Sequence, residues 1–307
     1  MSKLSLGGTM GTSYPQPEKH IDQCTNKELL HLALTETDDE NAWEAIRELH
    51  TRGSKEIFDN ACKLCLSSNA HERCVGADIL SQMGTPHPIF HEETVSILLK
   101  MLEQEQEPDV LNSIAVALGH RDDPRAIKPL ALLKNHPADH VRSGIVFGLL
   151  GFEDDLAIQT LIELSTDMDA EVRNWATFGL GSLTETDTPA LREALLVRLT
   201  DEDAEARGEA MVGLARRRDL RMLDSLLHDL EEGLFSSLLF QAATEICDPH
   251  FICPWCICVK LGKKKKGAGF IENWKKRLKN AHRQPLTGSL IPLSARGRWR
   301  GRRQHSV

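Results

Sequence analysis

A group of zinc-ligand residues stands at positions 247 to 258 of the sequence. Cys247, His250, Cys253 and Cys256 lie close together, and Cys258 follows two residues later. Thiolate sulfur and imidazole nitrogen are the ligands that tetrahedral zinc prefers. Structural zinc sites usually join two separated pairs of ligands across a folded loop, whereas these ligands lie in one short run. The spacing therefore favours free thiols and predicts no bound cofactor; zinc held by Cys247, His250, Cys253 and Cys256 stays as the alternative.

Another pair of thiols, Cys62 and Cys65, forms a C-x-x-C in the stretch "KEIFDNACKLCL". Ile57, Phe58 and Ala61 fall on the same helical stripe as these cysteines. A buried free cysteine packs as a small hydrophobic residue. This pair is therefore expected to belong to a helix core, and eight cysteines in 307 residues do not indicate a secreted disulfide framework.

Positive charge is concentrated at the C-terminal end. Of the 37 Lys and Arg, 15 lie in residues 260–307 beside one of the 45 acids, so that this segment carries a formal +14 and the preceding residues a formal −22. Three interpretations remain open. The segment is an arm that binds nucleic acid or another polyanion, since "WKKRLKNAHR" and "RGRWRGRR" combine charge with Trp; or it folds back on the acidic remainder; or it is an altered gene end without a selected function.

One pattern of residues recurs along the chain and predicts the helices that would position any site. We call it the recurring frame, each occurrence a copy, and the first residue of an occurrence its start. Each copy has a small or aliphatic residue three positions after its start and Leu or Ile seven positions after it. Offsets of three and seven share one helical face, which must be buried. Successive starts are separated by 31, 38, 31, 31, 34 and 32 residues. The starts are Ala42, Arg73, Leu111, Arg142, Arg173, Arg207 and Leu239.

A second apolar segment separates successive copies, as in "LAIQTLIELS" and "LRMLDSLLHDL", so each period predicts a helical hairpin. One hairpin cannot bury both apolar faces, and neighbours must stack. The predicted fold is all-α, an α-solenoid of about seven hairpins. It is expected over residues 25–249, after a flexible leader (1–24) and before a Cys-containing junction and a basic tail of low order (250–307).

The stretches "DMDAEVRNWATFGLG" and "DEDAEARGEAMVGLA" resemble HEAT repeats, in particular the short HEAT-like repeats of bilin lyases. The resemblance covers roughly residues 25 to 249. It implies a structural ladder in which turn aspartates and helix-start arginines of neighbouring copies pair. The ladder residues are Asp139, Arg142, Asp169, Arg173, Asp203 and Arg207. Asp169 and Asp203 also stand where helix N-caps are expected.

Two enzymatic alternatives come with this resemblance. Bilin lyase subunits handle a chromophore, and the related deoxyhypusine hydroxylases bind two irons through His-Glu dyads on successive helices. This sequence contains His71-Glu72 and His91-Glu92, at non-equivalent positions of the frame. Directly after the repeat arginines, where the dyads are expected, stand Ser143, Asn174 and Gly208. The di-iron site is therefore not expected, and chromophore handling is the stronger enzymatic alternative.

The position five residues after each start is apolar in the four central copies and is directed away from the core stripe. Two interpretations stay open: these side chains fill space between adjacent helices, or they form a hydrophobic strip that binds a partner helix or peptide. On the second, the function is a non-catalytic scaffold or adaptor. The groove residues are Val116, Phe147, Phe178 and Val212, with Val146, Met211, Ser143 and Asn174 beside them.

No stretch approaches the roughly 20 apolar residues of a membrane span, and the first twenty residues have no apolar core of a signal peptide. The expected location is cytoplasmic, with a protein partner of unknown identity and no membrane contact. Any binding of a polyanion or nucleic acid is expected through the basic tail only, because acidic repeats repel it.

Overall fold

The computed structural model describes residues 20–36, 39–232, 234 and 236–245. Within these ranges the chain is helical and has no strand. The expected leader, apart from residues 20 to 24, and the whole tail lie outside the described residues, as do the candidate zinc ligands Cys247, His250, Cys253 and Cys256. The boundary at residue 249 also falls there and stays a prediction.

Fourteen α-helices in the described ranges pair into seven helical hairpins, the number that the recurring frame predicts. They are α1 (Asn26–Thr35) with α2 (Asp39–Arg52), α3 (Lys55–Cys65) with α4 (Ala70–Ser81), α5 (His91–Gln104) with α6 (Pro108–Arg121), α7 (Ile127–Ala131) with α8 (Asp139–Leu149), α9 (Asp155–Leu164) with α10 (Ala170–Phe178), α11 (Pro189–Arg198) with α12 (Ala204–Arg216), and α13 (Leu223–Glu231) with α14 (Ser237–Glu245).

Four short helical turns complete the array. Three are 3-10 turns, and the fourth, η3, is a π-helical turn that directly continues α10. They are η1 (Ile21–Gln23), η2 (Pro124–Ala126), η3 (Gly179–Leu183) and η4 (Leu220–Met222).

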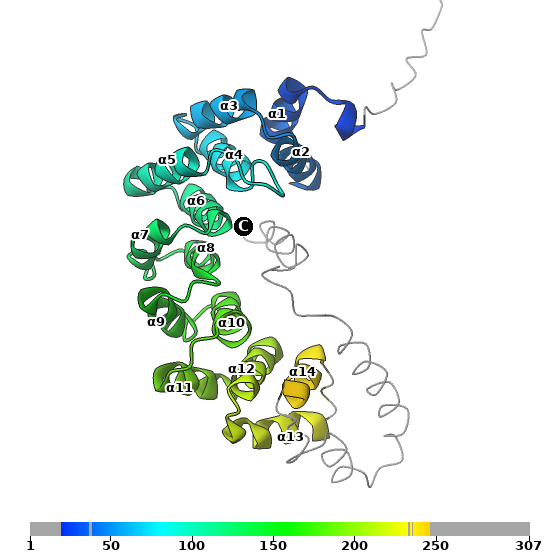
Figure 1. Cartoon of the computed structure of the whole chain (residues 1–307), viewed down its shortest axis with the longest axis vertical. Coiled ribbons are helices and arrows are strands. Elements are labelled where there is room, and N and C mark those ends of the chain that lie inside the picture. The colour runs from blue at the N-terminus through cyan, green and yellow to red at the C-terminus, as the bar shows by residue number, and fades with distance from the viewer. Residues whose placement is uncertain (1–19, 37–38, 233, 235, 246–307) are drawn as a thin grey trace, which may run out of the picture.

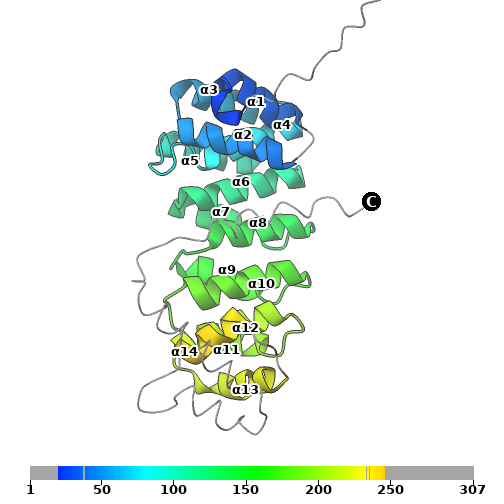
Figure 2. The same cartoon turned by 90° about the vertical axis from the view of Figure 1, so that its right-hand side faces the viewer.

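The hairpins stack into a curved solenoid (Figure 1). Odd-numbered helices form the outer layer of the arc through its middle, and even-numbered helices form the inner layer, which Figure 2 shows from the front. Every start of the recurring frame lies on an even-numbered helix. The predicted all-α solenoid is therefore confirmed, and the inner, concave face is built by the helices that carry the frame.

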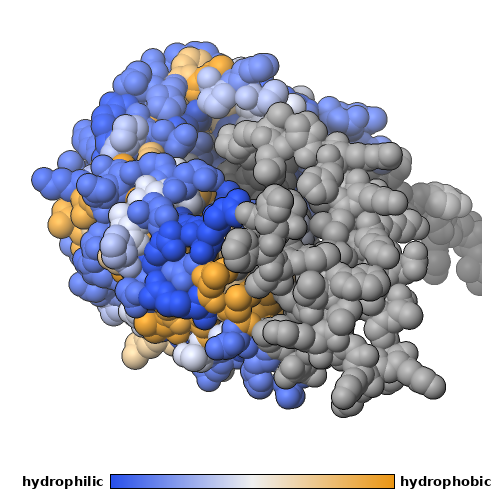
Figure 3. Space-filling model, turned by 60° about the horizontal axis from the view of Figure 1, so that its bottom comes forward, coloured by the Kyte–Doolittle hydropathy of each residue, from blue (hydrophilic) through white to orange (hydrophobic). Residues whose placement is uncertain are grey.

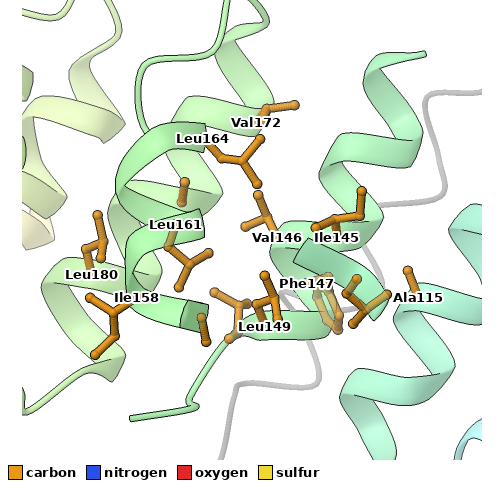
Figure 4. Packing of buried hydrophobic residues seen from close by; sticks show 14 of the residues in the cluster. Ala115, Ile145, Val146, Phe147, Leu149, Ile158, Leu161, Leu164, Val172 and Leu180 are labelled. Carbon is orange, nitrogen blue, oxygen red and sulfur yellow. The ribbon is translucent and has the colours of Figure 1, made fainter. Parts of the chain in front are cut away.

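The core lies between the two layers, where the frame predicts it. The third-step residues are buried in all seven copies, and the described seventh-step leucines are at most 1% exposed. Figure 4 shows the middle of this core, with Leu149 of α8 and Leu161 of α9 in the same packed region. Burial of these side chains stabilises each hairpin against its neighbours by the hydrophobic effect.

Helix starts follow the capping rules. Thr25 and Glu28 form the expected capping box, with the Glu28 amide donating to Thr25 Oγ1 at 3.3 Å and the Thr25 amide donating to Glu28 Oε2 at 2.6 Å. Asp154, Asp169 and Asp203 each accept two backbone N–H groups at the starts of α9, α10 and α12. The caps therefore fix where three helices of two neighbouring hairpins begin.

Glycines set the distance between neighbouring inner helices. A Cβ on Gly213 of α12 would lie 2.5 Å from the Gly181 Cα in η3, and one on Gly119 of α6 would lie 2.8 Å from the Gly148 Cα in α8. The equivalent joint between α8 and α10 differs, because Leu150 meets Gly179 there through its side chain. Two close backbone contacts thus flank one joint that contains a leucine.

The end of the array formed by α11 to α14 is largely hydrophilic where it is visible in Figure 3. Hydrophobic side chains appear there in separate small groups. No helix among the described residues has the length and apolar character that crossing a membrane requires.

Candidate partner-binding surface

The concave face is defined by three positions of the frame. The positions two residues before, one after and five after each start are directed about 140–160° away from the third-step residue, using about 100° per residue. Because the third-step residues are buried toward the outer helices, these three positions lie on the opposite side of each inner helix. We call them the concave positions.

Several predicted groove residues are not accessible for binding. Val146, Met211 and Val212 have no exposed surface, and Phe147 and Ser143 are each only 5% exposed. This corrects the expectation of an open apolar strip and agrees with the alternative that these side chains fill space between helices. The reason is the tight packing of each inner helix against both neighbours, α6 and α10 for α8, α10 and α14 for α12.

Val116, Phe178 and Asn174 remain half-buried and present part of their surface. A row of edge-on ring contacts connects the middle of this surface. His120 lies 5.7 Å from Phe147, Phe147 lies 6.2 Å from Trp175, and Trp175 lies 5.6 Å from Phe178, between ring centroids. Edge-to-face contacts at such distances are favourable beyond the area that they bury. We call His120, Phe147, Trp175 and Phe178 the aromatic row; it crosses α6, α8 and α10.

The sequence interpretation missed Trp175 and His120. Trp175 stands two residues after its start, a position that a single helix places between the core and the concave face. Its half-buried indole sits between the rings of Phe147 and Phe178. A Trp beside a candidate polar contact, Asn174, is a signal that could have identified it.

Polar side chains occupy the concave position one residue after the start in the copies that carry the aromatic row. Asn112, Ser143 and Asn174 occupy it in three consecutive copies. Asn112 is 1% exposed, and neither its amide nitrogen nor its amide oxygen has a hydrogen-bond partner in the described part of the chain; the Asn174 side-chain oxygen also lacks one there. Buried amides without partners are costly. Asn112 Oδ1 packs beside Gly144 of α8, so of these two amides it is the half-buried Asn174 that lies at the concave surface.

Arginines at the frame starts connect neighbouring hairpins on the edge of the array. Each guanidinium donates through one terminal nitrogen to two backbone carbonyls of the turn that precedes its own helix. Through Nε it donates to the carboxylate of an acid in the next copy. The shortest N···O distances are 2.7, 2.7, 3.1 and 3.3 Å. The pairs are Arg73–Glu105, Arg142–Asp167, Arg173–Asp201 and Arg207–Asp229.

The acidic partners differ from those that the resemblance implied. Asp169 and Asp203 use their carboxylates as N-caps, so Asp167 and Asp201, two residues earlier, meet Arg142 and Arg173 instead. Asp139 lies 3.4 Å from His140, and not within ion-pair distance of Arg142. Burial opposes ionisation of Asp167, but the hydrogen bonds from Arg142 and the Asp169 amide keep its pKa below the usual value.

Glu209 of α12 is a half-buried acid close to the π-helical turn η3. Burial raises the pKa of its carboxyl to about 7; the hydrogen bond from Ser182 Oγ, at 2.6 Å to Glu209 Oε2, opposes the rise and the charge of Glu205 adds to it. π-helical turns are frequent at functional sites. Glu209 therefore changes its charge near neutral pH at a joint between two inner helices.

The Glu209→Gln variant tests this titration. Because the folded pKa is above the unfolded value of roughly 4.3, the folded state holds a proton that the unfolded state loses, and wild-type stability falls as the pH rises from about 4.5 to 7. The free energy of unfolding of the variant relative to wild type should rise by about 2 kcal/mol between pH 5 and 8. Chemical denaturation at both pH values measures it, with the exposed Glu103→Gln variant as control.

The His-Glu dyads lie on different layers. His71, on α4, directs Nε2 toward the Leu34 carbonyl at 3.2 Å. His91 and Glu92, at the start of α5, lie near Asp123, with His91 Nε2 3.2 Å from Asp123 Oδ2. Among the described residues, this trio is the one group with ligand atoms close enough to share a metal ion. The guanidinium of Arg125 already pairs with Asp123 and Glu92, at 2.7 and 3.0 Å.

The Cys62 and Cys65 side chains lie on α3, as the helical stripe predicts. Cys65 is 3% exposed, and burial raises the pKa of its thiol to about 12. Burial also raises the pKa of Cys62. Thiolates, not thiols, react and bind metals. These cysteines therefore behave as core residues.

A cavity of about 210 Å³ opens between the inner helices of the first three hairpins. Trp43, His71, Cys74, Asp78 and Asp109 line it, and all five occupy concave positions of α2, α4 and α6. Asp78 is 4% exposed, whereas the Asp109 side chain is 63% exposed. The cavity thus combines an indole face with two carboxyl groups, the surroundings that favour a positively charged side chain.

Comparisons with known proteins agree with this architecture. A model of HEAT repeats matches residues 158–235. Protein YibA of Escherichia coli is 26% identical over 220 residues, which cover 69% of this chain and 78% of that protein. The X-ray structure of YibA superposes with a TM-score of 0.67 and 23% identity over 84% of this chain and 94% of that chain. The CpcE–CpcF complex of phycocyanin lyase from Nostoc gives a TM-score of 0.44 at 16% identity, over 79% of this chain and 98% of that chain.

Proposed function

Because the chain is a HEAT-repeat protein, as its resemblance predicted, we propose that it is a non-catalytic scaffold that binds a helix or an extended peptide of a partner protein along its concave face. The aromatic row carries this proposal. Trp175 and Phe178 are half-buried on a concave surface, and aromatic side chains of this kind contribute most of the binding energy in many interfaces.

The shape and chemistry of the surface support the same function. Stacked hairpins create an extended concave surface that can follow a long ligand. Beside the aromatic row, the half-buried Asn174 offers an amide group that can pair with the backbone of an extended chain. The residues that we propose as contacts are Val116, Asn174, Trp175 and Phe178. The buried Phe147 ring packs against Trp175 and holds it in place.

The Phe178→Asp variant tests the proposed contact. Peptides selected from a displayed random library against the full-length protein provide the probe, and fluorescence anisotropy gives their Kd. A charge in the aromatic row should weaken binding by at least about tenfold, because the apolar contact is replaced by a carboxylate that must lose its water. Leu132→Asp is the matched control, since Leu132 is 77% exposed at the end of the outer helix α7.

Thermal unfolding of both variants separates lost binding from lost folding, and the milder Val116→Asp variant repeats the test on α6. Equal loss of binding in Phe178→Asp and Leu132→Asp, or none in either, would refute a binding site on the aromatic row. Selection of no peptide at all would count against an extended ligand. The division into a leader, a repeat array to residue 249 and a tail is part of the same proposal.

A further inference from the structure

The concave positions of this protein carry a strong negative charge. Two residues before the starts, four copies have an acid, and the intervening copies have His71 and His140. Neighbouring members of this column lie close together, since His140 Nε2 is 3.6 Å from Asp109 Oδ1. Arg47, which pairs with Glu40 at 2.9 Å, is the one Lys or Arg at a concave position in the described hairpins. The acids of the column are Glu40, Asp109, Glu171 and Glu205.

The cavity beside Trp43 provides a defined binding position within this negatively charged face. Asp78 and Asp109 line it together with the indole of Trp43. Its volume of about 210 Å³ accommodates one long side chain rather than a helix. A guanidinium or ammonium group over an indole face is attracted by the ring, and nearby carboxylates add to this attraction. The cavity therefore fits an arginine or lysine side chain.

The chain itself contains a ligand of this chemistry. Residues 260–307 hold 15 Lys and Arg with one acid, against a formal −22 for the residues before them. An extended chain from Glu245 to residue 260 spans up to about 50 Å. The five joints from α14 to α4 cover about 40–50 Å at 8–10 Å per helix pair. The basic segment can therefore reach the cavity, and its attachment gives it an effective concentration on the order of millimolar.

We propose that the basic segment 260–307 docks on the acidic concave face of its own chain, with a lysine or arginine side chain in the Trp43–Asp78–Asp109 cavity. The docked segment covers the surface that a partner would use, so it competes with partner binding. Only this competition rests on the proposed scaffold function; docking itself is a property of the chain alone.

Carbodiimide coupling of the full-length protein tests the docking, because it joins lysine amines to carboxylates that are in direct contact. Mass spectrometry then identifies the pairs in an equal mixture of ¹⁴N- and ¹⁵N-labelled protein. Lysines of residues 260–279 should couple to Asp109, Glu171 and Glu205 at least about fivefold more than to the exposed acids Glu56, Glu103 and Asp155 of outer helices, within one isotope. Raising the salt from about 20 mM to 500 mM should abolish the preference.

The triple variant Asp109→Asn, Glu171→Gln, Glu205→Gln gives a second readout. Trypsin should cleave after the basic residues 260–303 at least about threefold faster in this variant than in the wild type, while the matched triple Glu56→Gln, Glu103→Gln, Asp155→Asn should leave the rate unchanged. Equal coupling to inner and outer acids, or equal cleavage in both triples, would overturn the proposal. Mixed-isotope products in excess would instead identify a second copy as the occupant. Peptide binding by the Phe178→Asp variant is measured separately, so either proposal can fail alone.

Discussion

Replacing Arg173 by alanine should lower the free energy of unfolding by about 3–4 kcal/mol. Arg173 is 9% exposed, and its guanidinium donates to the backbone carbonyls of Asp167 and Met168 and to the carboxylate of Asp201. Removing it leaves the buried Asp201 carboxylate and two part-buried carbonyls with fewer donors. It also cuts a link between two hairpins, and a repeat array depends on such links between neighbours. Urea denaturation followed by circular dichroism measures the change.

The control for this prediction is Arg47→Ala. Arg47 also forms an ion pair, with Glu40 at 2.9 Å, but their side chains are 55% and 82% exposed. Exposed ion pairs contribute about 0–1 kcal/mol. Equal destabilisation by the two substitutions would show that the ladder arginines do not hold the hairpins together.

Replacing Gly213 by alanine should destabilise the protein by about 3 kcal/mol, although alanine favours helices more than glycine by about 1 kcal/mol. A Cβ at Gly213 would lie 2.5 Å from the Gly181 Cα, and backbone cannot move aside as a side chain does. The helices must separate, and the core between α12 and η3 loses contacts. Thermal or chemical denaturation provides the measurement.

Gly179→Ala is the matched control, because the nearest atom to a Cβ there is the end of the Leu150 side chain. Leu150 can change rotamer, so the stability should stay within about 1 kcal/mol of the wild type. If Gly213→Ala were tolerated as well as Gly179→Ala, the close approach of α12 and η3 would not limit the packing.

The sequence was sufficient to predict the fold because the frame is local. Offsets of three and seven select one helix face wherever they occur, so the number of hairpins and the burial of Leu149 or Leu180 followed from periodicity alone. Capping at Thr25 was equally predictable, since a capping box needs residues only three positions apart.

The accessible part of the concave face could not be predicted in the same way. Exposure of Phe147, Val146 and Val212 depends on how far apart successive inner helices lie, and a single period contains no information on that distance. The acid that pairs with each ladder arginine could not be predicted for the same reason. Asp169 was a candidate for pairing with an arginine, but its carboxylate caps α10 instead. Contacts between copies decide such competitions.

The unequal joints of the inner layer have a consequence for ligands. At the two glycine pairs, Gly119 with Gly148 and Gly181 with Gly213, backbones nearly touch, whereas Leu150 lies between α8 and Gly179. The three successive joints are therefore of two kinds. On the scaffold function that we propose, a bound chain with strictly periodic anchors would not match the leucine joint, and the ligand would need an anchor spacing that changes there.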